Sequence, residues 1–370
     1  MKSPGARRVW SADLATLPPA PRVLLMKWSA LGDLALATAA IEDVFRALPG
    51  AHLDLDTPPR FAPLFAHDPR FRQVLGIDVR SAWLGGMARW LARVAAARYD
   101  LIIDMQSTDR SRLLIGVLVA AGRGPRIRVG NHRRWPYTAA PPAQPRHTHA
   151  LEHLRAALAS CAIPVGTDHP ILHPGPEHHA HAQALLEEHG LVRGRFALFM
   201  PGCQRAGWLK RWGWRRFATL ALSLARHGIE NVLLVGAEDE REECDAIATA
   251  CPEVAVNACG KTALLDLVPL AQAAACVVAN DTGTAHVASA AARPTVVVCG
   301  PTDPRRVRPA GTRVRALQAE LWCRSCYRKD CTHHSCMDVL SPEQVLDALA
   351  SLGALGAHGV PAVTATRGAP

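Results

Sequence analysis

The sequence predicts an α/β protein made of two doubly wound domains that face each other across a cleft. Short apolar runs typical of buried strands alternate with segments of helical periodicity. The alternation occurs twice, before and after a Pro- and His-rich stretch at 133–175. The chain has 370 residues, 49% of them hydrophobic, so each half can bury a core of ordinary size.

The first predicted domain covers residues 1–175 and begins with a strand at 22–27. A loop at 28–33 leads into a predicted helix at 34–50, which ends at a Pro-Gly pair. Further strands are predicted at 51–57, 99–106 and 126–130, with a helix from about Arg110. Strands that alternate with helices in this way form a parallel sheet.

The second predicted domain covers residues 176–353 and follows a link near 170–177. Strands ending in loops are predicted at 196–202, 231–240, 277–283 and 294–304, and a helix at 215–228. A last helix at 341–353 has Ser341 as its N-cap and Pro342 in its first turn. We expect residues 354–370 to be a disordered tail.

Histidines 178, 179 and 181 stand at the predicted start of a helix. We interpret them as a solvated helix start, because no carboxylate or cysteine has a spacing that would complete a metal site.

The net charge of +10 favours an anionic partner: nucleic acid, a phosphorylated substrate or an acidic membrane surface. No apolar run reaches the roughly 18 residues of a membrane span, and no signal peptide is evident, so we expect a cytosolic protein. Eleven cysteines, seven of them scattered in apolar stretches, argue against a secreted disulfide framework.

Polar residues at the predicted strand ends are the candidate site. They are Asp33, Asp104, Gln106, Lys210, Glu238, Asp281, Thr282 and His286. In a doubly wound sheet, ligands bind beyond the carboxyl ends of the strands. A dehydrogenase is disfavoured because no G-x-G-x-x-G follows the first strand.

The stretch "NDTGTAH" (280–286) places a helix N-terminus after a strand. Its free amides, the Thr282 hydroxyl and His286 could contact a phosphate, and Gly283 allows close approach. Lys210 would add a full positive charge to the same diphosphate. Glu238 could hold ribose hydroxyls. The alternative for this stretch is an ordinary turn.

Asp33 is predicted on the other side of the cleft. Its carboxylate could take a proton from a substrate hydroxyl, or it could cap a helix that starts at Leu34. Its position alone leaves both interpretations open.

The last four cysteines, Cys323, Cys326, Cys331 and Cys336, have the spacing C-x2-C-x4-C-x4-C and enclose His333 and His334. This spacing suits a compact zinc loop, and reduced, partly buried thiols are the alternative. It also fits a zinc knuckle, which is the basis of a second hypothesis, a basic nucleic-acid-binding protein. The low aromatic content of 5% counts against that hypothesis.

Five stretches resemble, in this order, glycosyltransferase family 9, the ADP-heptose:lipopolysaccharide heptosyltransferases. They are "VLLMKWSALGDLALATAAI", "YDLIIDMQSTDRSRLL", "KRWGWRRFATLA", "ANDTGTAHVASAAARPTVVVCGPTDP" and "WCRSCYRKDCTHHSCMDVLSPEQVLDAL". The resemblance covers about 21–350. It implies a GT-B fold of two Rossmann-like domains and inverting transfer of heptose from ADP-heptose to the lipopolysaccharide inner core, with no required cofactor.

The resemblance also implies roles for single residues. Asp33 corresponds to the catalytic base, and Lys210 to the lysine at the donor diphosphate. Glu238 corresponds to an acidic residue near the ribose. The donor-phosphate motif corresponds to Asp281, Thr282, Gly283 and His286, and an acceptor-facing motif to Arg110 and Ser111.

The sequence departs from the family at Met200, where the family usually has His, and the run up to Lys210 is longer by about two residues. A family 9 enzyme that uses another sugar nucleotide is therefore the nearest alternative. With either donor we expect an anionic glycolipid acceptor, peripheral contact with the cytoplasmic face of the inner membrane, and no nucleic-acid partner.

Overall fold

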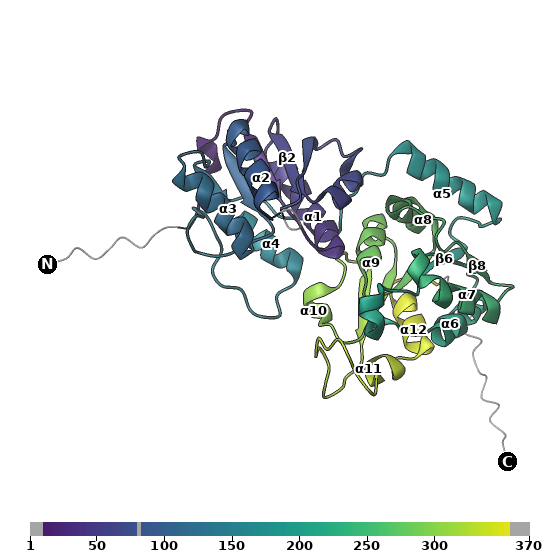
Figure 1. Cartoon of the computed structure of the whole chain (residues 1–370). Helices are drawn as coiled ribbons and strands as arrows, with labels where there is room; N and C mark the ends of the chain where they lie inside the picture. Colours follow the sequence, from purple (N-terminus) through teal and green to yellow (C-terminus); the bar gives the residue numbers. More distant parts are fainter. Residues whose placement is uncertain (1–9, 80–82, 356–370) are drawn as a thin grey trace, which may run out of the picture.

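The computed structural model describes residues 10–79 and 83–355, arranged as two α/β lobes side by side (Figure 1). Each lobe contains one parallel sheet with helices on both faces. This confirms the predicted fold class. Among the described helices, none has both the length and the apolar character needed to cross a bilayer.

The N-terminal sheet has the strand order β3-β2-β1-β4-β5. Its strands are β1 Arg22–Met26, β2 His52–Thr57, β3 Phe71–Gly76, β4 Leu101–Asp104 and β5 Ile127–Val129. Its helices are α1 Leu31–Ala47, α2 Trp83–Ala97, α3 Asp109–Ala120 and α4 Ala150–Ala159.

Alternate residues of β1 face opposite sides of this sheet, as the period of two requires. Val23 and Leu25 belong to the core shared with α1 and α4. Leu24 and Met26 belong to a separate core with Trp90 of α2 and side chains of α3. All four β1 side chains are fully buried, which explains why a central parallel strand reads as a continuous apolar run.

The C-terminal sheet has the strand order β11-β10-β9-β6-β7-β8. Its strands are β6 Phe196–Met200, β7 Asn231–Leu234, β8 Ala255–Asn257, β9 Cys276–Asn280, β10 Thr295–Cys299 and β11 Val314–Gln318. Its longer helices are α5 Pro176–Glu188, α6 Trp214–Arg226, α7 Arg241–Ala250, α8 Leu267–Ala273 and α12 Pro342–Ser351. Its short helices are α9 Gly283–Ala288, α10 Pro304–Val307 and α11 Ser335–Asp338.

Each predicted strand overlaps an observed strand; the predictions are 22–27, 51–57, 99–106, 126–130, 196–202, 231–240, 277–283 and 294–304. Ser341 caps α12 as predicted, accepting a hydrogen bond from the Gln344 N–H. The predicted start of the first helix is wrong, because α1 begins at Leu31 rather than Leu34. The predicted boundary at 175/176 falls at the start of α5, and part of the predicted tail, 356–370, lies outside the described residues.

Histidines of α5 are not merely solvated. Nδ1 of His178 and Nδ1 of His181 each lie 2.7 Å from a carboxylate oxygen of buried Asp266. Nε2 of His67 lies 2.7 Å from Glu177 and so joins the N-terminal domain to the same helix. The partner Asp266 was hidden from sequence reasoning because it is more than 80 residues away.

Helices α1 and α9 form the principal contact between the two domains. A Cβ atom on Gly32 would lie 2.8 Å from Cδ2 of His286, and one on Gly283 would lie 2.9 Å from Cβ of Leu31. Glycine at both positions therefore allows two helix N-termini, one from each domain, to meet at the cleft.

Candidate functional site

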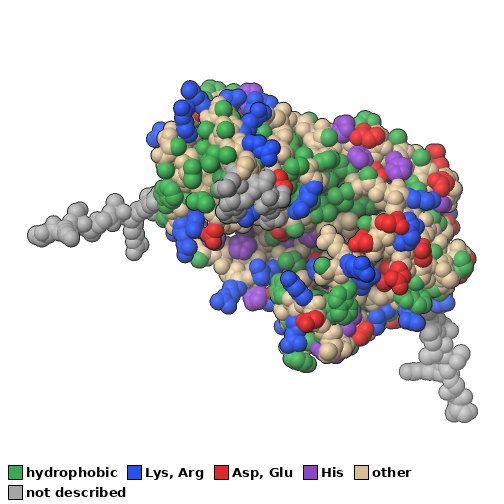
Figure 2. Space-filling model, in the orientation of Figure 1, with side chains coloured by type: hydrophobic (Ala, Val, Ile, Leu, Met, Phe, Trp, Pro, Cys, Tyr) green, Lys and Arg blue, Asp and Glu red, His purple; other side chains and the backbone are tan. Residues whose placement is uncertain are grey.

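A cavity of about 460 Å³ lies between the domains at the carboxyl ends of their strands. The N-terminal domain contributes Ala30, Leu31 and Gly32. The rest of the lining comes from the C-terminal domain: Cys203, Gln204, Ala206, Gly207, Lys210, Ala237, Asp239, Glu240, Asp281, Thr282, Gly283 and Thr284. Figure 2 shows the surface hollowed between the two lobes.

Lys210 and Asp281 form an ion pair in the wall of this cavity. Nζ of Lys210 lies 2.8 Å from Oδ2 of Asp281 and donates to its backbone carbonyl at 3.2 Å. Thr302 donates its hydroxyl to the same Oδ2 at 2.6 Å. The Asp281 side chain is only 5% exposed, whereas that of Lys210 is 31% exposed. Asp281 therefore orients the lysine, and the lysine presents the positive charge to the cavity.

The sequence brings Lys210 to this wall through a short helical segment, η3 Arg205–Lys210, that follows β6. Asn280 at the end of β9 holds the neighbouring chain: its side chain accepts from Trp212 N–H and donates to the carbonyls of Pro201 and Gly202. Sequence reasoning missed both Asn280 and Thr302. The one available signal was that Asn280 directly precedes the predicted motif.

Thr282 and Thr284 supply hydroxyls at the start of α9. Their Oγ1 atoms are 2.8 Å apart, and both residues line the cavity. Together with Lys210 they provide donors for an anionic group.

His286 lies one turn further into α9 and does not line this cavity. It is 6% exposed, and its ring lies against Gly32. Burial lowers the pKa of His286 to about 4, although the charges of Asp281 and Asp33 act in the opposite direction. The imidazole is therefore neutral at pH 7, and in this structure it packs at the domain contact.

Asp33 is exposed in the first turn of α1, beside the cavity residues Leu31 and Gly32. It is not the N-cap: its carboxylate accepts from the Ala30 N–H at 3.3 Å, from within the helix. Its charge is felt by buried Lys27 at the end of β1, whose pKa is lowered by burial while Asp33 and Asp104 oppose the shift. An exposed carboxylate at the cleft is free to accept a proton from a ligand.

The loop between β1 and α1 is fixed by Gln106. Oε1 of Gln106 accepts from the backbone N–H groups of Trp28 at 3.0 Å and Ser29 at 3.2 Å, and Nε2 donates to the Ser29 hydroxyl. Asp104 is buried at the end of β4 and accepts from the Tyr137 hydroxyl at 2.6 Å. These two residues support the loop that carries Asp33.

Glu238 and Glu240 have different surroundings. The Glu238 side chain is 74% exposed and pairs with Arg241 at 2.6 Å, which lowers the pKa of this carboxyl. Glu240 lines the cavity and accepts from the Ala237 N–H at 2.8 Å, and burial raises its pKa. The carboxylates that the structure brings to the cavity wall near β7 are thus Asp239 and Glu240, while Glu238 lies just outside.

Arg110 and Ser111 lie in the first turn of α3. The Ser111 hydroxyl is buried and forms a capping box with Thr108, donating to its carbonyl at 2.9 Å. Ser111 therefore stabilises the helix start, and Arg110 is the side chain of this pair that is partly accessible.

The four clustered cysteines surround a small cavity of about 20 Å³ together with His333 and His334. Burial, with a contribution from the other three cysteines, raises the pKa of the Cys336 thiol. Within residues 10–79 and 83–355, no group of three or more His, Cys, Asp or Glu side chains is placed to hold a metal ion. The predicted zinc site is therefore not confirmed by the described residues. The seven other cysteines are buried, as expected for scattered apolar positions.

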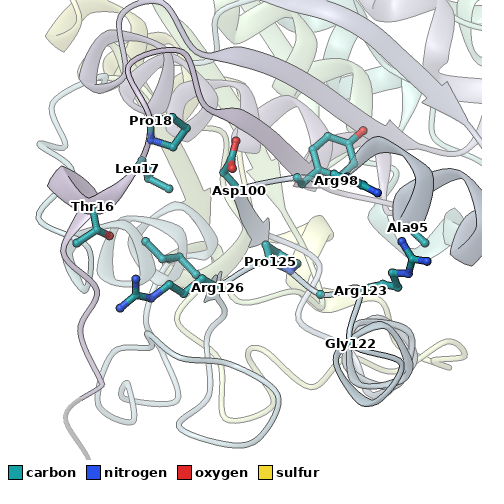
Figure 3. Close-up of a pocket in the computed structure, with 13 residues that line it drawn as sticks. Thr16, Leu17, Pro18, Ala95, Arg98, Asp100, Gly122, Arg123, Pro125 and Arg126 are labelled. Atoms are coloured by element: carbon teal, nitrogen blue, oxygen red, sulfur yellow. The ribbon is translucent and has the colours of Figure 1, made fainter.

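A second cavity, of about 480 Å³, lies at the opposite end of the N-terminal sheet, where β1, β4 and β5 begin. Figure 3 shows Arg98 and Arg123 on one side of it and Arg126 on the other, with Asp100 between them. The last turn of α2 and the turn that follows α3 line it, and the carboxyl-terminal ends of both helices carry partial negative charge. This cavity lies at the amino ends of the strands, whereas ligands of doubly wound sheets bind beyond the carboxyl ends, so it is not the candidate site.

Residues 87–336 match glycosyltransferase family 9 (heptosyltransferase). The chain belongs to this family. It is 28% identical over 336 residues to lipopolysaccharide heptosyltransferase 1 of Pseudomonas aeruginosa, covering 84% of this chain and 88% of that protein. The family 9 chain is therefore a glycosyltransferase, as the sequence resemblance implied.

Solved structures of related proteins have the same fold as this family 9 chain. A family 9 glycosyltransferase from Veillonella parvula has a TM-score of 0.76 at 20% identity, covering 90% of this chain and 97% of that one. The Escherichia coli heptosyltransferase WaaC with ADP has a TM-score of 0.65 at 22% identity, covering 90% and 99%. The fold is GT-B, with the cavity at the cleft between its two domains.

Proposed function

We propose that this glycosyltransferase moves heptose from ADP-heptose to the inner core of lipopolysaccharide, with inversion at the anomeric carbon. One observation carries the proposal: Lys210, oriented by Asp281, faces a cavity whose opposite wall leads directly to Asp33. A cation on one wall and a carboxylate beside the opposite wall are what a transfer with an anionic leaving group needs. The Pseudomonas aeruginosa relative is named a lipopolysaccharide heptosyltransferase, and one structural neighbour is solved with ADP.

In the proposed reaction, Asp33 removes a proton from an acceptor hydroxyl as that oxygen attacks the anomeric carbon. The bond from the anomeric carbon to the diphosphate breaks, and ADP leaves with the electron pair. Lys210 and the hydroxyls of Thr282 and Thr284 stabilise the negative charge that develops on the diphosphate. The Asp281–Thr302 bond holds Lys210 in place before charge develops.

Other site residues have supporting roles in this proposal. Gly283 allows the close approach of the two domains, and His286 contacts the domain interface as a neutral ring. Glu238 would contact the ribose, with Glu240 as the nearer carboxylate. Arg110, supported by Ser111, would face the acidic acceptor.

We further propose that the enzyme works at the cytoplasmic face of the inner membrane, as a peripheral protein, because its acceptor is a membrane-anchored anionic glycolipid. No cofactor is required by the proposed steps. Zinc at Cys323, Cys326, Cys331 and Cys336 would be purely structural. Metal analysis of protein purified without chelator tests this zinc site. One equivalent of zinc that is lost in Cys326→Ser supports the site, and protein without zinc excludes it.

The experiment that tests the function combines binding and turnover. Isothermal titration with ADP, ADP-heptose and UDP-glucose should give micromolar binding of the adenine nucleotides and much weaker binding for Asp281→Ala. Transfer to truncated lipopolysaccharide should fall at least about 10²-fold in Asp33→Asn, with donor affinity kept. A preference for UDP-glucose would instead support a family 9 enzyme with another donor. Full activity of Asp33→Asn would remove the proposed base.

A further inference from the structure

The segment between β11 and α11, residues 319–334, forms an extended loop below the C-terminal domain (Figure 1). Trp322 in this loop is 88% exposed, more than any other large hydrophobic side chain in the described ranges. Tyr327 is also exposed, at 45%. Exposing the apolar surface of a tryptophan to water is unfavourable, and contact with an apolar or interfacial phase would remove that cost.

The loop of Trp322 and the adjacent helix α10 carry exposed basic side chains. Arg324, Arg328 and Lys329 are exposed in the same loop, and Arg305 and Arg306 lie on α10. We call these five residues, with Trp322 and Tyr327, the Trp322 surface. Figure 2 shows basic and hydrophobic side chains together on this lower protrusion.

The Trp322 surface carries an excess of positive charge. Arg305 pairs with Asp303 at 2.8 Å, and Arg324 pairs with Glu320. Arg328 and Lys329 form no ion pair with any described residue, and Asp330 is the one other acidic neighbour in the loop. Five basic and three acidic side chains leave two positive charges, and Asp303 is almost fully buried.

The loop is held by contacts rather than free. The Tyr327 N–H donates to the Pro301 carbonyl at 2.8 Å, and the Tyr327 hydroxyl accepts from the Asp303 N–H at 3.2 Å. The Arg306 guanidinium lies 5.9 Å from the centre of the Tyr327 ring. The indole of Trp322 stacks on His333, with the ring centres 6.3 Å apart. The surface is therefore presented in a fixed orientation.

This loop is also tied to the donor side of the cleft. Nε2 of His334 lies 2.8 Å from the carbonyl of Leu209, the residue before Lys210. On the other side, Nδ1 of His147 from the N-terminal domain lies 2.9 Å from Asp303. A partner that binds the Trp322 surface is therefore positioned beside the cleft.

We propose that the Trp322 surface docks on an anionic phospholipid bilayer and holds the cleft beside the lipid-anchored acceptor. This inference rests on the proposed function for its acceptor. Tryptophan inserts at the headgroup level, and each Lys or Arg near an anionic leaflet adds electrostatic attraction. An exposed indole among unpaired cations has the chemistry that such a surface requires.

Sedimentation of the full chain with vesicles tests the docking. We expect binding to phosphatidylcholine vesicles with about a third phosphatidylglycerol, little binding to phosphatidylcholine alone, and loss at high salt. Replacing the indole and the two unpaired cations together, Trp322→Ser with Arg328→Gln and Lys329→Gln, should weaken partition at least about 10-fold. A control variant, Val192→Ser with Arg193→Gln, removes one exposed apolar side chain and one cation elsewhere and should bind like the parent.

Activity assays separate this inference from the proposed function. The triple variant should keep its kcat/KM on a lipid-free core oligosaccharide and lose activity only on vesicle-embedded acceptor. Unchanged vesicle binding by the triple variant and by Trp322→Ser alone would overturn the docking surface. An equal loss of activity on the lipid-free acceptor would also overturn it and would assign these side chains to acceptor contact. A change in oligomeric state would overturn it too and would assign them to contact with a second copy of the chain. If the protein binds vesicles through Trp322 but transfers no heptose, the docking surface is supported and the proposed function is refuted.

Discussion

Replacing Lys210 by methionine tests the central electrostatic feature of the cleft. Methionine keeps most of the aliphatic length and removes the charge. In the parent, Nζ of Lys210 lies 2.8 Å from Oδ2 of Asp281, and that oxygen also accepts from Thr302 at 2.6 Å. The variant therefore leaves a buried carboxylate with one hydroxyl donor and no cation.

Two magnitudes follow from this geometry. Loss of a preorganised charge at the leaving group should lower kcat about 10²–10³-fold. Breaking a fully buried pair costs about 3–5 kcal/mol, but Lys210 is partly exposed, so we expect a loss of about 1–3 kcal/mol in the free energy of unfolding. Adding Asp281→Asn to Lys210→Met should recover much of that stability without recovering kcat, because the amide carries no unpaired charge.

The assays are steady-state release of ADP from ADP-heptose and urea-induced unfolding. Lys261→Met is the matched control: Lys261 pairs with Glu188 at 3.4 Å, outside the cavity, and half of its side chain is exposed. We expect the free energy of unfolding of the control to lie within about 0.5 kcal/mol of the parent and its kcat within about twofold. If Lys210→Met keeps kcat within threefold of the parent while the protein remains folded, the lysine does not stabilise the leaving diphosphate.

Three further changes test the contacts around the site. Gly32→Ala should overpack the α1–α9 contact against His286 and lower the free energy of unfolding by about 1–3 kcal/mol. The control Gly85→Ala, in open space on α2, should raise it by about 0.5–1 kcal/mol. Equal effects of the two variants would mean that the α1–α9 contact accommodates the added methyl group. Gln106→Leu leaves two loop N–H groups without their acceptor and should lower kcat more than donor affinity, and an unchanged kcat would show that the loop holds its shape alone. Burial raises the pKa of Asp56 from 3.8 to about 7, so the native state binds the extra proton and the free energy of unfolding should fall as pH rises from about 4 to about 7. The Asp56→Asn variant can still accept hydrogen bonds from Trp28 and Trp90 and should flatten this slope in unfolding measured against pH. A slope that persists in the variant would have another origin.

The sequence was sufficient for the fold class and for most strands of the two sheets. Fully buried parallel strands such as β1 and β9 appear as continuous apolar runs, and their polar ends mark the edge where ligands bind. Asp281, Thr282 and Lys210 were therefore predictable as residues of one region. The helix start at Leu31 was not, because Leu-Gly-Asp carries no capping signal at Ala30 and local propensity is weak there.

By itself, then, the sequence determined the periodicities, the strand order along the chain and the residues available at each strand end, because these are local properties of neighbouring side chains. Only the tertiary structure decided which of these residues meet. Thr302 reaches Asp281 across 21 positions, and Gln106 reaches Trp28 across 78. The same holds for His286 against Gly32, and for Glu240 rather than Glu238 at the cavity wall. Such contacts depend on how two sheets and their crossovers are placed in space, and no local pattern of hydrophobicity encodes that placement.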